Sequence, residues 1–123
     1  MQTKPVRGYR DLIVWQRAME LCVALYHLTQ SFPREEIYGL TNQMRRASVS
    51  IASNIAEGQG RLTREQYRHF LGIARGSSFE IETQILIAKE LGFADAARFE
   101  EVEKLSDEVG KMLTGLVKKL QAP

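Results

Sequence analysis

The sequence predicts an all-α fold, an antiparallel up-down-up-down bundle of four helices. Apolar residues recur three or four positions apart in four separate segments, which is the spacing of one helix face. Only 3 prolines occur among 123 residues, and the connections between the segments are short. A hydrophobic content of 44% and a charged content of 26% are typical of a globular protein. We therefore predict one bundle domain over residues 11–121, preceded by a basic arm over residues 1–10.

The first helix is predicted to run from Asp11, its cap, to about Ser31, because Phe32-Pro33 stops it. Its apolar residues form two faces. The broader one, assigned to the core, consists of Trp15, Ala18, Met19, Cys22, Leu25 and Tyr26. A second stripe repeats every seven residues, at Val14, Leu21 and Leu28. Because a helix with two apolar faces needs more than one partner surface, we predict that this stripe contacts another subunit.

The second helix is predicted over residues 41–57 and is the central packing element. Its other faces carry small or polar residues, which lets neighbouring helices approach closely. Gly58 and Gly60 are expected to end it, because glycine adopts positive φ at little cost. Its core stripe is Leu40, Met44, Ala47, Ile51 and Ile55.

The third helix is predicted to begin after a capping box, in which Thr63 accepts a hydrogen bond from the Gln66 amide. It should extend to about Leu91 and end at Gly92. Phe79 and Leu86 lie seven residues apart on a side away from the core, so they complete the predicted subunit interface. The core residues are Tyr67, Phe70, Leu71, Ala74, Ile81, Ile85 and Ala88.

The last helix is predicted to run from near Asp95 to Leu120. Its outer face is rich in acidic residues and is expected to be solvated, whereas Lys118 and Lys119 suit the negative end of the helix dipole. Its core stripe is Phe99, Val102, Ser106, Val109, Leu113, Leu116 and Leu120.

Arginines provide the best candidate binding surface. Residues 61–76 hold four arginines and one glutamate, a local net charge of +3, whereas the whole chain carries +2. Arginine binds phosphate through paired N–H donors. The residues predicted to bind nucleic acid are Arg45, Arg46, Arg61, Arg64, Arg68 and Arg75. The alternative is that these arginines pair with Glu57, Glu65, Glu80 and Glu82 within or between subunits.

Candidate catalytic and metal sites are weak. Glu65 and His69 form a single pair on one segment, whereas a di-iron bundle needs two inward-facing Glu-x-x-His pairs. Ser77-Ser78 lack a nearby histidine base, and Cys22 has no basic neighbour to activate its thiol. We expect no enzymatic activity, no metal and no cofactor. No apolar run reaches membrane-spanning length and the N-terminus lacks the pattern of a signal peptide, so a cytoplasmic location is expected.

Several short segments together resemble one family, the four-helix-bundle proteins associated with intervening sequences of bacterial 23S ribosomal RNA. The resemblance covers about Tyr9 to Leu120, and it extends to the accessory protein of diversity-generating retroelements. The segments that carry it include Asp11-Leu12, Val14-Trp15-Gln16, Phe32-Pro33, Tyr38-Gly39-Leu40-Thr41, Arg45-Arg46-Ala47, Asn54-Ile55-Ala56-Glu57-Gly58, Glu82-Thr83-Gln84 and Val109-Gly110-Lys111-Met112-Leu113.

The resemblance implies assembly into a homopentameric barrel, and a role for the retroelement relatives in binding a reverse transcriptase and nucleic acid through a basic surface. At Ala52 the family often has proline, so a kink implied there is expected to be absent or milder. We therefore predict a non-enzymatic oligomer that binds RNA or DNA through its arginines. The alternative is an oligomeric scaffold that recruits a protein partner without binding nucleic acid. Salt separates the two, because only charge-mediated binding weakens steeply as salt rises.

Overall fold

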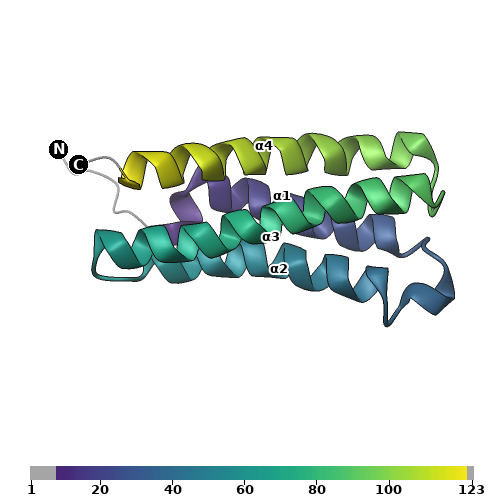
Figure 1. The fold of residues 1–123 in the computed structure, drawn as a ribbon, viewed down its shortest axis with the longest axis horizontal. Helices are drawn as coiled ribbons and strands as arrows, with labels where there is room; N and C mark the ends of the chain where they lie inside the picture. The colour runs from purple at the N-terminus through teal and green to yellow at the C-terminus, as the bar shows by residue number, and fades with distance from the viewer. Residues whose placement is uncertain (1–7, 122–123) are drawn as a thin grey trace.

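The computed structural model describes residues 8–121 and shows four long helices and no strand in that range (Figure 1). Successive helices run in opposite directions, as predicted for an up-down-up-down bundle. The predicted arm falls largely outside the described residues, and its last three residues, 8–10, belong to a short 3-10 helix. The elements are a 3-10 helix Gly8–Asp11, α1 Ile13–Thr29, a 3-10 helix Arg34–Glu36, α2 Leu40–Gln59, α3 Arg64–Glu90 and α4 Ala96–Gln121.

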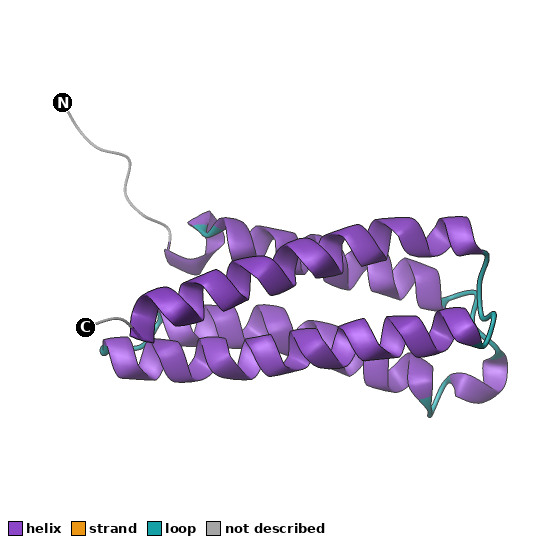
Figure 2. Cartoon of the chain, turned by 45° about the horizontal axis from the view of Figure 1, so that its top comes forward, coloured by secondary structure: helices purple, strands orange, loops and turns teal. Residues whose placement is uncertain are grey.

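Each long helix packs against two neighbours, so that α1, α2, α3 and α4 form a closed ring around one core (Figure 2). The predicted stripes of α2, α3 and α4 supply most of that core, with Met44, Ile51, Leu71, Phe99 and Leu113 fully buried. Partial exposure remains for the ends of these stripes, which lie near the ends of the bundle. The core therefore confirms the helical periodicity of these three segments.

The buried face of α1 combines residues from both predicted faces, because Ala18 and Leu25 are buried as predicted and the stripe predicted to contact another subunit is buried with them. The stripe of Val14, Leu21 and Leu28 lies inside the bundle, with no member more than 4% exposed. Met19 and Tyr26, which were assigned to the core, are exposed. The predicted interface role of Val14, Leu21 and Leu28 is therefore wrong, because residues that fill the chain's own core have no surface left for another subunit. Periodicity shows that α1 has two apolar stripes, but it does not show where between them the buried face is centred.

The start of α1 also differs from the prediction. Asp11 closes the 3-10 helix, and α1 begins at Ile13 with Leu12 as its N-cap, which makes no side-chain capping bond. The preceding turn provides a backbone partner at this end instead, since the Leu12 amide donates to the Tyr9 carbonyl at 3.0 Å. The Tyr9 ring packs edge-on against Trp15, with centroids 5.1 Å apart. The 3-10 helix is thus attached to the base of α1.

The glycines at the end of α2 act through their small size. Gly60 has a φ of −80°, and in the described chain positive φ occurs at Gly8 and Gly92 alone. The predicted positive φ at Gly58 and Gly60 is therefore wrong, and α2 extends to Gln59. A Cβ at Gly58 would lie 2.9 Å from Phe70 Cβ, so glycine is required where α2 and α3 approach each other. The predicted Thr63 cap and the turn at Gly92, whose φ is +67°, are confirmed.

Gly58→Ala is expected to lower the free energy of unfolding by about 1–3 kcal/mol through overpacking. In an open helical position the same change raises it by up to about 1 kcal/mol. Gly72 supplies that control, since a Cβ there would meet no atom within 4 Å. Denaturant unfolding of Gly58→Ala and Gly72→Ala measures both effects. Equal stabilisation of the two variants would show that α2 and α3 are not in close contact at Gly58.

Candidate nucleic-acid interface

Formal charge is separated along the long axis of the bundle. The start of α1, the α2–α3 turn and the end of α4 lie at one end, and the α1–α2 and α3–α4 connections lie at the other (Figure 1). When each helix is divided at its middle, residues 8–21, 50–77 and 109–121 form the first half and hold nine Lys or Arg against four Asp or Glu, a net of +5. The second half, residues 22–49 and 78–108, holds six against eleven, a net of −5. We call these the basic half and the acidic half.

The six predicted arginines do not form one surface. A rise of 1.5 Å per residue places Arg46 about 20 Å along the bundle from Gln59, the last residue of α2, and Arg61 lies two residues beyond it. The sequence correctly placed Arg46 in a helix and Arg61 in the turn that follows it, but it did not show that they belong to opposite halves. Those in the basic half are Arg61, Arg64, Arg68 and Arg75, and those in the acidic half are Arg45 and Arg46.

Arg45 joins α1 to α2. Its Nε donates to Thr29 Oγ1 at 2.9 Å, and its guanidinium lies over the Tyr26 ring, 4.8 Å from the centroid. Thr29 in turn donates to the Leu25 carbonyl at 2.8 Å, so the contact is part of a network at the end of α1. This arrangement occupies the Arg45 side chain in helix packing. Arg46 is exposed on the other side of α2.

The two arginines at the α2–α3 turn make different contacts, one local and one across to α4. Arg61 pairs with Glu57 at 3.1 Å, which is one of the pairings expected under the alternative interpretation. Arg64 reaches across to the last turn of α4, where it donates to the carbonyls of Lys119 and Leu120 at 3.0 and 3.3 Å. Carbonyls in the last turn of a helix have no intrahelical partner, so Arg64 caps α4.

Arg68 and Arg75 follow Arg64 along the side of α3 that faces α4. Arg75 Nε donates to Thr114 Oγ1 of α4 at 3.1 Å. Arg68 is half-buried and lines a shallow hollow, together with Val117 of α4 and other residues from both helices. Arg68 is therefore the arginine of this row whose guanidinium is least committed to packing.

Sequence reasoning missed the contribution of α4 and of the first turn to the basic half. Lys118 and Lys119 are exposed beside Arg64, and Arg10 lies at the same end with its guanidinium 5.8 Å from the centre of the Tyr9 ring. The predicted antiparallel topology was sufficient to find them, because it places the end of the fourth helix beside the turn between the second and third helices. The basic half is thus built from three separate parts of the chain.

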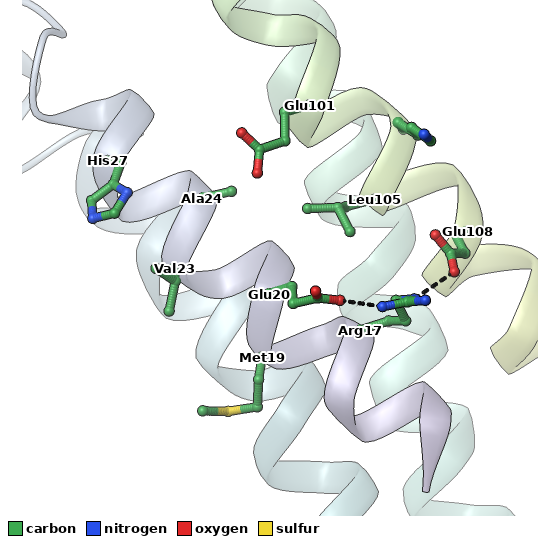
Figure 3. A pocket seen from close by; sticks show the side chains of 10 residues that line it. Arg17, Met19, Glu20, Val23, Ala24, His27, Glu101, Leu105 and Glu108 are labelled. Carbon is green, nitrogen blue, oxygen red and sulfur yellow. Dashed lines mark hydrogen bonds and ion pairs between the residues drawn. The ribbon is translucent and has the colours of Figure 1, made fainter.

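A groove of about 700 Å³ lies between α1 and α4 (Figure 3). Its floor is apolar, with Ala24 and Leu105, and Glu20, Glu101 and Glu108 stand on its sides. Arg17 donates to Glu20 and to Glu108, each at 2.7 Å, and these bonds raise the pKa of the guanidinium, the Glu20 bond first. Three glutamates against Arg17 and Lys104 give the lining a formal net charge of −1, which does not favour a polyanion.

The predicted catalytic candidates are not assembled into a site. Ser77 shares a 2.9 Å hydrogen bond with Ser50 of α2, and His69 packs edge-on against Phe70. Cys22 Sγ accepts a 3.4 Å hydrogen bond from Ser48. Within residues 8–121 no group of three His, Cys, Asp or Glu side chains is placed to hold a metal ion. None of the described helices combines the length and the apolar character needed to cross a membrane.

Burial raises the pKa of Tyr67, which packs beside Gly58. The folded state therefore favours the neutral phenol, and above the ordinary pKa of about 10 the unfolded chain ionises first. The neutral phenol's contribution to the free energy of unfolding is fully present below that pH, and it is lost as the pH rises through the raised pKa. We expect the free energy of unfolding to fall less between about pH 9 and 11 in Tyr67→Phe than in the wild type. Parallel denaturation curves at several pH values measure this, and identical slopes would exclude the contribution of Tyr67.

The fold and surface define a class of protein: an all-α four-helix bundle with a positive net charge in one half and a negative net charge in the other. The chain belongs to the 23S rRNA-intervening sequence protein family, whose model matches residues 10–115. The fold is also similar to the crystal structure of a protein of unknown function from the S23 ribosomal protein family of Bacteroides thetaiotaomicron VPI-5482. That similarity has a TM-score of 0.77 and 21% identity, and it covers 86% of this chain and 99% of that chain. A search of curated proteins finds no match.

Proposed function

We propose that this protein is a non-enzymatic oligomer that binds structured RNA or DNA through its basic half. The observation that carries the proposal is the separation of a net +5 from a net −5 along the bundle axis. A phosphate backbone is drawn to the positive end and repelled by the other end, which gives the complex a defined orientation. The family name, which refers to an intervening sequence of ribosomal RNA, makes structured RNA the first probe to use.

Assembly would multiply this charge. A cyclic oligomer whose symmetry axis runs parallel to the helices brings the same end of every subunit to one rim. A pentamer of this kind, as the resemblance implies, would carry a ring of basic ends. Such a ring offers many phosphate contacts at once, although each subunit supplies only a modest number.

Fluorescence anisotropy of a labelled RNA hairpin and a matched DNA duplex, titrated with protein at several salt concentrations, tests the binding proposal. We expect the logarithm of the affinity to fall linearly with the logarithm of salt, by about 0.9 for each phosphate contact on duplex DNA and about 0.7 on a single strand. Absence of binding at low salt would contradict the proposal. It would favour the alternative of a scaffold that recruits a protein partner.

Self-association is proposed through the outer side of α3. Phe79 is 48% exposed and Leu86 is 59% exposed, and both lie on the side predicted to contact another subunit. Light scattering should therefore report an oligomer for the wild type. We expect Phe79→Ser with Leu86→Ser to reduce the mass to that of a monomer while helical content is kept.

The matched control for this variant is Ile37→Ser, which replaces an exposed apolar residue outside α3. It should leave the mass unchanged. A wild-type protein that is monomeric at all concentrations tested would exclude self-association. An oligomer that persists in the double variant would place the contact on another surface.

A further inference from the structure

A second hollow, distinct from the groove between α1 and α4, lies in the basic half. Its volume is about 510 Å³ and it is lined by Tyr9, Ser53, Asn54, Ala56, Glu57 and Phe70. These residues come from the 3-10 helix, the last two turns of α2 and the second turn of α3. The hollow therefore lies where the proposed nucleic-acid surface would place a phosphate backbone, but its lining is aromatic and polar.

Two aromatic rings line this hollow, and an arginine lies over each of them. The Tyr9 ring packs against Trp15 and has Arg10 at 5.8 Å from its centroid. The Phe70 ring has Arg61 at 4.7 Å from its centroid. Guanidinium planes and aromatic rings are the surfaces on which proteins stack unpaired bases, and the cations beside them meet the attached phosphates.

Hydrogen-bond acceptors form the polar part of the lining. Asn54 Nδ2 donates to the Ser50 carbonyl at 2.8 Å and to Ser50 Oγ at 3.0 Å, which fixes the amide and leaves its Oδ1 as an acceptor. Glu57 uses Oε1 to bind Arg61, so Oε2 remains as a second acceptor. An occupant that donates hydrogen bonds and carries a flat ring matches these groups.

We propose that this hollow binds one unpaired nucleobase of the bound nucleic acid, with a preference for an amino-bearing purine. The amino group donates to Asn54 Oδ1 or Glu57, and the larger purine ring covers more aromatic surface than a pyrimidine. The inference rests on the proposed function, because the phosphates on either side of the base would be held by the basic half. It adds the class of nucleic acid: one with an unpaired or bulged position, rather than a continuous duplex.

The test compares RNA hairpins that differ at one position: fully paired, with one bulged adenosine, or with one bulged uridine. We expect the bulged adenosine to increase the affinity at least about fivefold, as one stacked base does elsewhere, and the bulged uridine to increase it less. The single tryptophan, Trp15, lies directly behind Tyr9 and provides an independent signal. Its fluorescence should change with the bulged hairpins and stay constant with the paired one.

Tyr9→Leu removes the ring and keeps an apolar cover on Trp15. It should abolish the preference for the bulge and leave the affinity for the paired hairpin unchanged. Tyr38→Leu is the matched control, because Tyr38 is exposed near the start of α2, at the other end of the bundle, and should retain the preference. Equal affinity of the wild type for all three hairpins would overturn the base pocket while the proposed function stands. The same conclusion would follow if the preference for the bulge survived in Tyr9→Leu, or if Tyr9→Leu lost affinity equally for every hairpin. Absence of binding to any hairpin at low salt would remove the proposed function, and the base pocket with it.

Discussion

Leu21→Ala is expected to lower the free energy of unfolding by about 2–5 kcal/mol and to leave the subunit count of the folded protein unchanged. Leu21 is fully buried, near the middle of α1, and its side chain fills the centre of the chain's own core. Removing it leaves a cavity that the surrounding helices close only partly. Denaturant unfolding measures the loss of stability, and light scattering measures the mass.

Met19→Ala is the matched control, since Met19 is exposed on the same helix. It should change the free energy of unfolding by less than about 0.5 kcal/mol. The opposite pattern, in which Leu21→Ala releases monomers at little cost in stability, would restore the stripe of Val14, Leu21 and Leu28 to a subunit interface. This comparison therefore tests directly whether the stripe of Val14, Leu21 and Leu28 belongs to the core.

The number, order and approximate ends of the helices could be predicted because local signals determine them. The Thr63 cap, Gly92 and the apolar stripes of α2, α3 and α4 each depend on neighbours within a few residues. The orientation of α1 could not be predicted in the same way. Its apolar residues extend over two adjoining stripes, and the centre of the buried face depends on the shapes of α2 and α4 where they pack on α1, which the α1 sequence does not contain.

The glycines show the same limit of prediction from local sequence, here for single residues. The sequence identified Gly58 as special, but it assigned the wrong cause, because a glycine required for positive φ and one required for close approach look alike in a sequence. The neighbour that distinguishes them is Phe70, twelve residues further along the chain and on another helix. Gly92, by contrast, follows the end of its helix in the ordinary way and was predicted correctly.

The candidate surface was predicted only in part because charge was counted along the chain. Counting residues 61–76 found the row on α3, but it could not add Lys118 and Lys119 from the end of α4. It also grouped Arg45 with this row, whereas Arg45 packs on Tyr26 at the other end of the bundle. The antiparallel topology brings charged residues from distant parts of the chain close together in space. The basic half and the acidic half result from this proximity.

Charge reversal in the basic half is expected to have the largest effect on binding. Arg61→Glu with Arg68→Glu is preferred to a change at Arg64, because Arg64 caps α4 and its replacement would disturb the fold. Arg46→Glu is the control: it makes the same kind of change on an exposed arginine of the acidic half. All variants should keep the helical content and oligomeric mass of the wild type.

The measurement that tests the central proposal most directly is the dissociation constant of these variants for one RNA hairpin at about 50 mM salt, followed by its salt dependence. The proposal predicts that Arg61→Glu with Arg68→Glu weakens binding at least about tenfold and makes the salt slope shallower, by about 0.7 to 0.9 for each phosphate that the variant no longer neutralises. Arg46→Glu should remain within about twofold of the wild type. An equal weakening in both variants, or none in either, would contradict binding through the basic half.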